Sequence, residues 1–343
     1  MQVISSKDNE FIKHIKKLKD KKYRDLNNEY IIEGIKIIEE AINEKANIKQ
    51  VVICDDCEKT SNISKELMYE IARYECIYVT KKIFDSLTDV SNPQGILAIV
   101  EKNAVKSKIS NIKDSEKSET IGVEEKEIIA ENEIDYNQDI IVALDDIQDP
   151  GNLGTILRTV DSIGINQILV SKGTADSYNP KVVRSTMGAI FRVKIIECED
   201  LENTLKEIQK HNFEIVVTSL QTKNSIYDID YKKKVIVIGN EANGVEPRIQ
   251  KIADKKVKIP MLGKTESLNA SVATGIILYE YVRQKRGWGI GGTSLNPALE
   301  RSKFNMKLHT VMVEPEIPQN TRKYCQNLCN NRFQITSCTS IRI

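Results

Sequence analysis

Hydrophobic residues are distributed along the chain in four ways, and the changes between them predict its organisation. Residues 1–100 alternate short β-branched runs with helical segments, which predicts a small α/β domain. Residues 101–138 are rich in Lys, Glu, Ser and Asn, and such a composition buries too little apolar surface to fold, so a flexible acidic linker is expected. Residues 139–286 predict a second α/β domain. Residues 287–343 show no period and predict a disordered tail.

The first of these domains is expected to be a compact sandwich of strands and helices. It begins with a basic helix, followed by a strand at 30–33 and a helix at 35–43. KQVVICDD, CIYVT and the end of SNPQGILAIV are strand-type runs. The basic helix has two interpretations, a solvated surface or a contact with the RNA backbone. Its basic residues are Lys13, Lys16, Lys17, Lys19, Lys21, Lys22 and Arg24.

The second domain is expected to contain an open parallel sheet. Its apolar runs are continuous rather than alternating, as in strands that are buried on both faces. The runs are IIVALDD, NQILVS, FEIVVTSL, KVIVIGN and KVKIP. Helices are expected between them at 153–163, 180–187, 201–210 and 267–286. In such a sheet the ligand lies at the carboxyl ends of the strands.

The first candidate for chemistry is ALDDIQDPGNLGTILR, residues 143–158. A strand ends at Asp145-Asp146, and a Gly/Asn-rich loop leads into a helix whose free N–H groups suit an anion. Asn152 is expected to cap this helix. Arg158 lies one and a half turns further along. Alone, the segment could equally be a capped helix with a surface arginine.

Two further segments repeat this design of an apolar run that ends in a polar loop. VIVIGNEANGV (235–245) places Glu241 directly after a strand, between glycines that permit close backbone approach. KIPMLGKTESLNASVATGIILYE (258–280) places an extended segment before a helix. Its GKTES is not a phosphate-binding loop, because Lys258 stands where that motif needs its first glycine. Taken singly, the two segments are a tight turn and a core helix.

Composition narrows the class of protein. Lys and Arg number 50 against 49 Asp and Glu, so no overall field draws the chain to nucleic acid. No apolar run is long enough to span a bilayer and no signal peptide is evident, so a cytoplasmic protein without a membrane partner is expected. The three histidines lie outside the motifs, which disfavours a histidine base. Cys54 and Cys57 form a lone C-x-x-C, which predicts free thiols and no metal site.

Together and in this order, the three motifs resemble the SpoU (TrmH-like) branch of the SPOUT RNA methyltransferases. The resemblance implies a SPOUT-type open parallel sheet with a C-terminal trefoil knot. It also implies an enzyme that transfers a methyl group from S-adenosylmethionine to a ribose 2′-hydroxyl of structured RNA. The helix at 270–281 would pack against its counterpart in a homodimer. Residues 1–100 resemble the L30e-like substrate-binding domain of such enzymes, which favours RNA contact for the basic helix and ribosomal over transfer RNA.

The resemblance also implies roles for individual residues. The catalytic residues would be Asn152, Arg158, Glu241, Ser267 and Asn269. The cofactor-binding residues would be Thr218, Ser219, Leu220, Gly239, Asn240, Ile259, Met261 and Leu268. Arg158 suits the positioning of RNA and the stabilisation of a developing alkoxide, but arginine is a poor base, so the general base stays open.

Other functions remain open at this point. They are a tRNA 2′-O-methyltransferase, a non-catalytic RNA-binding protein of the same fold, and an enzyme that methylates a base nitrogen. The tail adds a separate question. MKLHTVMVEPEIPQNT (306–321) resembles the start of a TrmL-like tRNA methyltransferase, and a one-nucleotide shift of plausible codons for 322–343 restores that family's continuation. We therefore expect the natural protein to end near Arg286, with a read-through tail beyond it; an extension with its own role is the alternative.

Overall fold

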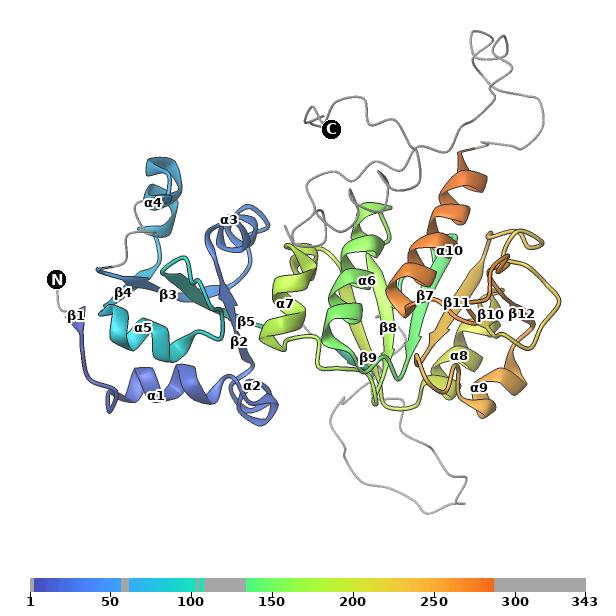
Figure 1. Ribbon diagram of the computed structural model, residues 1–343, viewed down its shortest axis with the longest axis horizontal. Coiled ribbons are helices and arrows are strands. Elements are labelled where there is room, and N and C mark those ends of the chain that lie inside the picture. The colour runs from blue at the N-terminus through green and yellow to red at the C-terminus, as the bar shows by residue number, and fades with distance from the viewer. Residues whose placement is uncertain (1–2, 57–61, 103–104, 108–133, 287–343) are drawn as a thin grey trace, which may run out of the picture. The chain divides into compact units, whose positions relative to one another are not determined.

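The structure is a computed structural model that describes residues 3–56, 62–102, 105–107 and 134–286 (Figure 1). Most of the expected linker and all of the expected tail lie outside these residues. The domain boundaries drawn from the sequence therefore stay predictions. In the described part of the chain, no helix combines the length and the apolar character needed to cross a membrane.

The N-terminal part contains a five-stranded mixed sheet in the order β1-β4-β3-β5-β2. β5 runs antiparallel to both β3 and β2, and β4 runs parallel to β3 and β1. The strands are β1 (Val3–Ile4), β2 (Glu29–Glu33), β3 (Ile48–Cys54), β4 (Glu75–Val79) and β5 (Ile96–Glu101). The helices are α1 (Glu10–Lys17), α2 (Lys21–Asn27), α3 (Ile35–Asn43), α4 (Lys65–Ile71) and α5 (Lys81–Leu87). Apolar clusters on both faces of the sheet confirm the expected sandwich, although β1, α4 and α5 were not anticipated.

The expected basic helix is two helices. Asp20 interrupts it, because its carboxylate accepts a hydrogen bond from the Lys22 backbone N–H and caps α2. Arg24 is buried, and its guanidinium donates to the carbonyls of Leu18 and Lys19 and pairs with Asp176. The interpretation of Arg24 as part of an RNA-binding surface is therefore wrong.

The second sheet has seven strands in the order β12-β10-β11-β7-β8-β9-β6, and every pair is parallel. This confirms the open parallel sheet. The strands are β6 (Val105–Ser107), β7 (Ile140–Asp145), β8 (Gln167–Ser171), β9 (Lys194–Cys198), β10 (Glu214–Thr218), β11 (Lys234–Gly239) and β12 (Lys255–Val257). β9 was not anticipated, and β6 lies inside the segment expected to be a linker.

Helices cover both faces of this sheet (Figure 1). Alternate side chains of β7 point to opposite faces: Val142 and Leu144 pack with α6 and α10, and Ile141 and Ala143 pack with α8 and α9. The helices are α6 (Pro150–Ser162), α7 (Pro180–Thr186), α8 (Leu201–Lys210), α9 (Pro247–Ile252) and α10 (Ala270–Lys285). The carboxyl ends of β7 and β11 therefore lie between two helical layers, and both layers can contribute to sites there.

The cysteine motif differs from expectation at one position. Cys54, at the end of β3, takes part in a disulfide, so the prediction of a free thiol there is wrong. Cys57 lies outside the described residues. Among the residues that the structure does describe, no group of three or more His, Cys, Asp or Glu side chains is arranged to hold a metal ion.

Candidate active site at the carboxyl ends of the strands

Three polar side chains, one from each of the three motifs, meet at the carboxyl ends of the strands. The amide of Asn152 donates a hydrogen bond to Glu241 Oε1 at 2.5 Å. The amide of Asn269 donates to Asn152 Oδ1 at 2.9 Å. These residues come from α6, from the loop after β11 and from the start of α10. Segments more than 80 residues apart are thus joined by Asn152, which uses both ends of its amide group.

The start of α6 explains why Asn152 is available for this role. Asp149 is the N-cap, since its Oδ1 accepts from the backbone N–H of Asn152 at 2.8 Å, and Pro150 occupies the first turn. The expectation that Asn152 caps the helix is wrong. Because Asp149 satisfies the helix end, the side chain of Asn152, itself buried, can bridge the other motifs.

The loop that carries Glu241 is pinned at its base. The backbones of Asn240 and Gly244 exchange two hydrogen bonds, of 3.1 and 2.9 Å. The Asn240 amide donates to the Asp146 carbonyl at 2.8 Å, and its oxygen accepts from the backbone N–H groups of Ala242 and Asn243. A Cβ on Gly239 would lie 2.2 Å from the Gly244 carbonyl carbon, so this close approach requires glycine. The loop therefore holds Glu241 in a defined place.

Asn269 divides its side chain between two functions. Its oxygen caps α10 by accepting from the Ser271 backbone N–H at 3.0 Å, while its amide nitrogen reaches Asn152. The helix begins at Ala270, slightly later than expected. Ser267 precedes it in an exposed segment. The cap fixes Asn269 relative to α10, and so orients its amide toward Asn152.

Arg158 is not part of the hydrogen-bonded cluster. It lies on the exposed side of α6 with Thr155, whereas Asn152 and Leu153 are buried. No hydrogen bond or ion pair joins its guanidinium to another residue in the described part of the chain. The structure thus brings together Asn152, Glu241 and Asn269, and leaves Arg158 and Ser267 outside the cluster.

The expected cofactor residues follow three adjacent strands, β12, β10 and β11. Thr218 ends β10, but its hydroxyl donates to the Val237 carbonyl at 3.2 Å. Ser219 donates its backbone N–H to Val257, and the next residue, Leu220, is 62% exposed. Gly239 and Asn240 form the pinned loop described above.

The segment 259–268 supplies the remaining cofactor residues. Ile259, Met261 and Leu268 are half-buried in it. Its backbone makes no hydrogen bond to other backbone groups in the described part of the chain, so its donors and acceptors are free to meet a ligand. Leu262 in the same segment is fully exposed. Free backbone groups beside apolar side chains fit a nucleoside, such as the adenosine part of S-adenosylmethionine: the apolar side chains can contact the adenine ring and the backbone can bind the polar groups.

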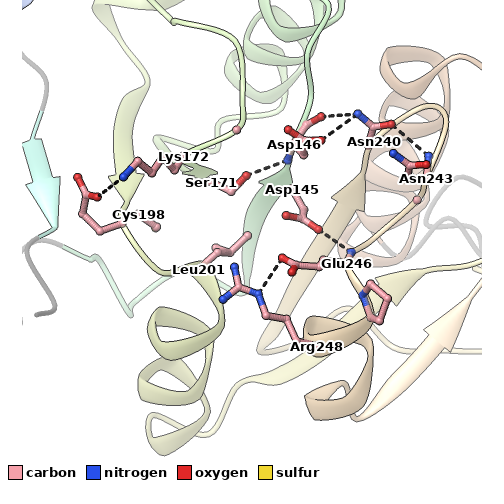
Figure 2. Close-up of a pocket in the computed structure, with 14 residues that line it drawn as sticks. Asp145, Asp146, Ser171, Lys172, Cys198, Leu201, Asn240, Asn243, Glu246 and Arg248 are labelled. Carbon is pink, nitrogen blue, oxygen red and sulfur yellow. Dashed lines mark hydrogen bonds and ion pairs between the residues drawn. The ribbon is translucent and has the colours of Figure 1, made fainter. Parts of the chain in front are cut away.

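A separate cavity of about 320 Å³ opens on the α8 and α9 side of the same loop (Figure 2). Asn240 is the one residue that it shares with the expected site. Its other lining residues, which the sequence did not single out, include Asp145, Asp146, Ser171, Lys172, Leu201, Glu246 and Arg248. Burial raises the pKa of the Asp145 carboxyl, and the negative charges of Glu246 and Asp146 add to this effect, although a backbone hydrogen bond from Glu246 opposes it. The sequence marked Asp145-Asp146 only as the end of a strand, and this was the one signal that could have drawn attention to the cavity.

The open parallel sheet, with a polar cluster at its carboxyl edge, defines an α/β enzyme of the open-sheet class. The model of the SpoU rRNA Methylase family matches residues 139–279, and that of the MRM3-like substrate binding domain matches residues 9–98. The chain belongs to the SpoU rRNA methylase family and is an S-adenosylmethionine-dependent RNA 2′-O-methyltransferase.

Individual relatives agree with this assignment. The chain is 28% identical over 280 residues to the 23S rRNA (guanosine(2553)-2′-O)-methyltransferase RlmP of Bacillus subtilis, covering 81% of this chain and 98% of the relative. It is 30% identical over 253 residues to an uncharacterised tRNA/rRNA methyltransferase of Mycoplasma pneumoniae, covering 72% and 94%. The crystal structure of an AdoMet-bound rRNA methyltransferase from Sinorhizobium meliloti has a TM-score of 0.65 at 28% identity and covers 82% of this chain and 98% of its own.

Proposed function

We propose that the protein methylates a ribose 2′-hydroxyl of ribosomal RNA, that it does so as a cytoplasmic homodimer, and that the Asn152 cluster is its catalytic centre. The observation that carries this proposal is the pair of hydrogen bonds that joins Asn152 to Glu241 and Asn269. Relatives named as 23S rRNA guanosine 2′-O-methyltransferases support ribosomal RNA as the substrate class.

The chemistry needs positioning more than strong acid–base groups. S-adenosylmethionine supplies an electrophilic methyl group, which a 2′-hydroxyl attacks in line. Residues of 218–220, 239–240 and 259–268 would hold the cofactor, with Ile259 and Met261 at its adenine. Asn152, Glu241 and Asn269 form a fixed polar wall, and Ser267 lies two residues before Asn269. The wall orients the ribose without reorganising during the reaction.

Arg158 is suited to the developing charge rather than to proton removal. Its guanidinium is exposed on α6 and free to reach a phosphate or the reacting oxygen. Arginine stays protonated in proteins, so it stabilises an alkoxide by charge and by forked hydrogen bonds. We therefore assign it to positioning and charge stabilisation.

The N-terminal domain would bind RNA through the lysines of α1 and α2. Lys17, Lys21 and Lys22 are exposed and Lys16 is half-exposed. Lys13 and Lys19 are paired with Glu10 and Asp89. The unpaired lysines can neutralise phosphates, which supplies affinity that does not depend on sequence. The mixed sheet beneath them would act as the platform.

The proposed homodimer would use α10. This helix buries Ile277 and Leu278 in the core, yet Val272 and Tyr279 are about half exposed on its other side. A helix that is apolar on both sides needs a second partner to cover it. The trefoil knot implied by the resemblance, in the segment that leads into α10, also stays a proposal.

The test is methyl transfer from labelled S-adenosylmethionine into ribosomal RNA transcribed without modifications. Label should appear in a ribose-methylated nucleotide, identified after nuclease digestion by mass spectrometry. Arg158→Ala should lower the rate by roughly 100-fold, because a charge that meets the transition state is lost.

The matched control is Arg73→Ala, which removes an arginine that is exposed and paired with Glu70 in the N-terminal domain. It should change the rate by less than about twofold. Label on transfer RNA alone would overturn the ribosomal substrate. Cofactor binding without label on either RNA would overturn the catalytic proposal.

A further inference from the structure

The cavity beside Asp145 lies at the carboxyl ends of four parallel strands, where open α/β sheets bind ligands. β7, β8, β9 and β11 reach it, and α8 and α9 begin at its lower wall. The cavity does not coincide with the proposed cofactor site, which follows β10, β11 and β12. It is nevertheless bounded by the loop that carries Glu241.

Asp145 is the feature of the cavity that points to a ligand. The residue is only 4% exposed, and what remains accessible faces the cavity. Oδ2 accepts from the Glu246 backbone N–H at 2.7 Å, whereas Oδ1 has no hydrogen bond within the described part of the chain. Figure 2 shows the carboxylate pointing into the space between Ser171, Leu201 and Glu246. Oδ1 is therefore the free acceptor that this nearly buried side chain presents to the cavity, and a ligand that supplies a donor would meet it there.

The rest of the wall combines cationic side chains with two apolar ones. Lys172 lies at the opening, 3.6 Å from Glu199, and its side chain is 80% exposed. Arg248 lies opposite, with Nε at 2.8 Å from Glu246. The apolar lining residues are Leu201 and Pro247. The carboxylates are not arranged as a metal site among the described residues, so an uncharged organic group with N–H donors is the better match.

We propose that this cavity binds an unpaired guanine base of the RNA substrate, with the Asp145 carboxylate accepting from guanine N1–H and the N2 amino group. The inference rests on the proposed function, since it presumes an RNA substrate. Enzymes that modify RNA read unpaired bases by their hydrogen-bonding edge and by apolar contact with the ring. Leu201 and Pro247 would contact the ring, and Lys172 or Arg248 would donate to O6.

Guanine is the base whose edge matches this arrangement. It presents two adjacent donors, N1–H and N2–H, and a carboxylate can accept both. Adenine presents an acceptor at N1, uracil a single donor between two acceptors, and cytosine an acceptor beside its amino group. Each of these would leave Asp145 facing an acceptor or short of a donor, which a buried carboxylate penalises.

The cavity is also connected to the catalytic cluster. Asn240 donates to the Asp146 carboxylate at 3.2 Å and to its carbonyl at 2.8 Å, next to Asp145. Glu241 follows Asn240 directly and reaches Asn152. Glu246, two residues after the pinned loop, holds Asp145 by its backbone N–H. A base bound at Asp145 would thus stabilise the loop that presents Glu241.

The experiment is a ligand-observed NMR titration of the full chain with GMP, IMP and AMP, with the cofactor site saturated by S-adenosylhomocysteine. IMP lacks only the N2 amino group, and AMP lacks both donors and O6. We expect GMP to bind about tenfold more tightly than IMP and about 100-fold more tightly than AMP. Since all three carry the same phosphate, the ratios report the base edge alone.

Asp145→Asn should bring the GMP to IMP ratio close to one, because the amide can keep the Glu246 hydrogen bond but offers a donor where guanine needs an acceptor. Asp139→Asn is the matched control at the other end of β7, where the carboxylate pairs with Lys285, and should keep the ratio. Asn243→Trp, on the exposed loop, should fill the cavity and weaken all three nucleotides, and it serves if Asp145→Asn fails to fold. Equal affinities for GMP, IMP and AMP in the unaltered protein would overturn the inference, as would an unchanged ratio in Asp145→Asn.

The two proposals fail separately. Methyl transfer to ribosomal RNA without guanine preference would remove the cavity inference and leave the proposed function. Guanine preference that depends on Asp145, without methyl transfer to any RNA, would remove the proposed function and leave the cavity as a base-binding site.

Discussion

The two sides of the 240–246 loop are built on opposite principles. On the α6 and α10 side, Asn152 has a partner at each end of its amide, and Asn269 is held by a helix cap. On the α8 and α9 side, Asp145 is buried with one oxygen lacking a hydrogen bond. The polar groups of the first side are hydrogen-bonded without any ligand, whereas the free oxygen of the second side would receive its hydrogen bond from one.

This difference shows where stability and function compete. A fully paired polar cluster stabilises its own geometry and needs no reorganisation during the reaction. A desolvated carboxylate costs folding free energy, and it is retained where that cost serves recognition. Three substitutions can separate the effects on stability from those on function. One acts on the loop itself, one on the α6 and α10 side, and one on the α8 and α9 side.

The largest effect is expected for Gly239→Ala, which should disrupt both sides. The new Cβ would meet the Gly244 carbonyl carbon and the Val245 nitrogen at 2.2 Å, and backbone there cannot yield. The free energy of unfolding should fall by about 2–3 kcal/mol. Methyl transfer and guanine preference should be lost together. Chemical denaturation measures the stability, and the methyl-transfer assay and the nucleotide titration measure the two activities.

Gly275→Ala is the control for that loss of stability. It adds the same methyl group inside α10, where a Cβ would meet nothing within 4 Å. Alanine favours a helix over glycine, so stability should rise by up to about 1 kcal/mol. If Gly239→Ala were as stable as the unaltered protein, the tight loop would not be what holds the two sides together.

Asn152→Ala should disrupt the first side alone. Glu241 and Asn269 lose their common partner, so the rate of methyl transfer should fall by roughly 100-fold. The GMP to IMP ratio should stay the same, because Asp145 and its neighbours are untouched. Single-turnover kinetics with ribosomal RNA and the nucleotide titration provide the measurements.

Asn47→Ala is matched to it, because Asn47 also donates its amide to a glutamate, Glu101, at 2.5 Å, but in the N-terminal domain. Its rate should stay within about twofold of the unaltered protein. A parallel loss of guanine preference in Asn152→Ala would mean that the two sides are one site.

Asp145→Asn should disrupt the second side and change the free energy of unfolding least. Unlike most substitutions, it should raise that free energy. Burial raises the pKa of Asp145 above its unfolded value, so the folded state favours the protonated carboxyl. Stability from this group is therefore greatest below the unfolded pKa of about 3.9 and is lost as pH rises through the raised folded pKa. Asparagine does not titrate, so the variant should be more stable than the unaltered protein at pH 7.

The pH dependence checks the cause of that difference. The advantage of Asp145→Asn should shrink as pH falls through the raised folded pKa of Asp145 toward the unfolded value of about 3.9, because the carboxyl becomes neutral in the folded protein first. Urea denaturation at both pH values measures it. A variant less stable at pH 7, with the same pH slope as the unaltered protein, would show that the buried charge carries no folding cost.

Much of the fold and the cluster could be predicted from the sequence, because continuous apolar runs mark buried parallel strands. Asn152, Glu241 and Asn269 each follow such a run, and the structure joins them. The prediction that Asn152 caps α6 was wrong because the neighbouring residues were overlooked. An Asp directly before a Pro marks a helix cap, and here that pair is Asp149-Pro150. β6 was missed because a three-residue edge strand in a polar segment carries no period.

The cavity could not be predicted in the same way. Its residues come from the ends of four strands and from two helix starts, and no spacing in the sequence relates them. Asp145-Asp146 was visible as a strand end, but which face each carboxylate takes depends on the pleat. Whether an oxygen finds a donor depends on Glu246, 101 positions further along the chain.

The pinned loop between Asn240 and Gly244 has a thermodynamic consequence. It contributes Glu241 to one side, and its continuation contributes Glu246 to the other, so a molecule bound on either side acts on one shared element. If a guanine base raises the affinity for the cofactor by some factor, linkage requires the cofactor to raise the affinity for guanine by the same factor. Order of addition would then be immaterial at equilibrium, and the enzyme would retain its methyl donor most firmly when the correct RNA is in place.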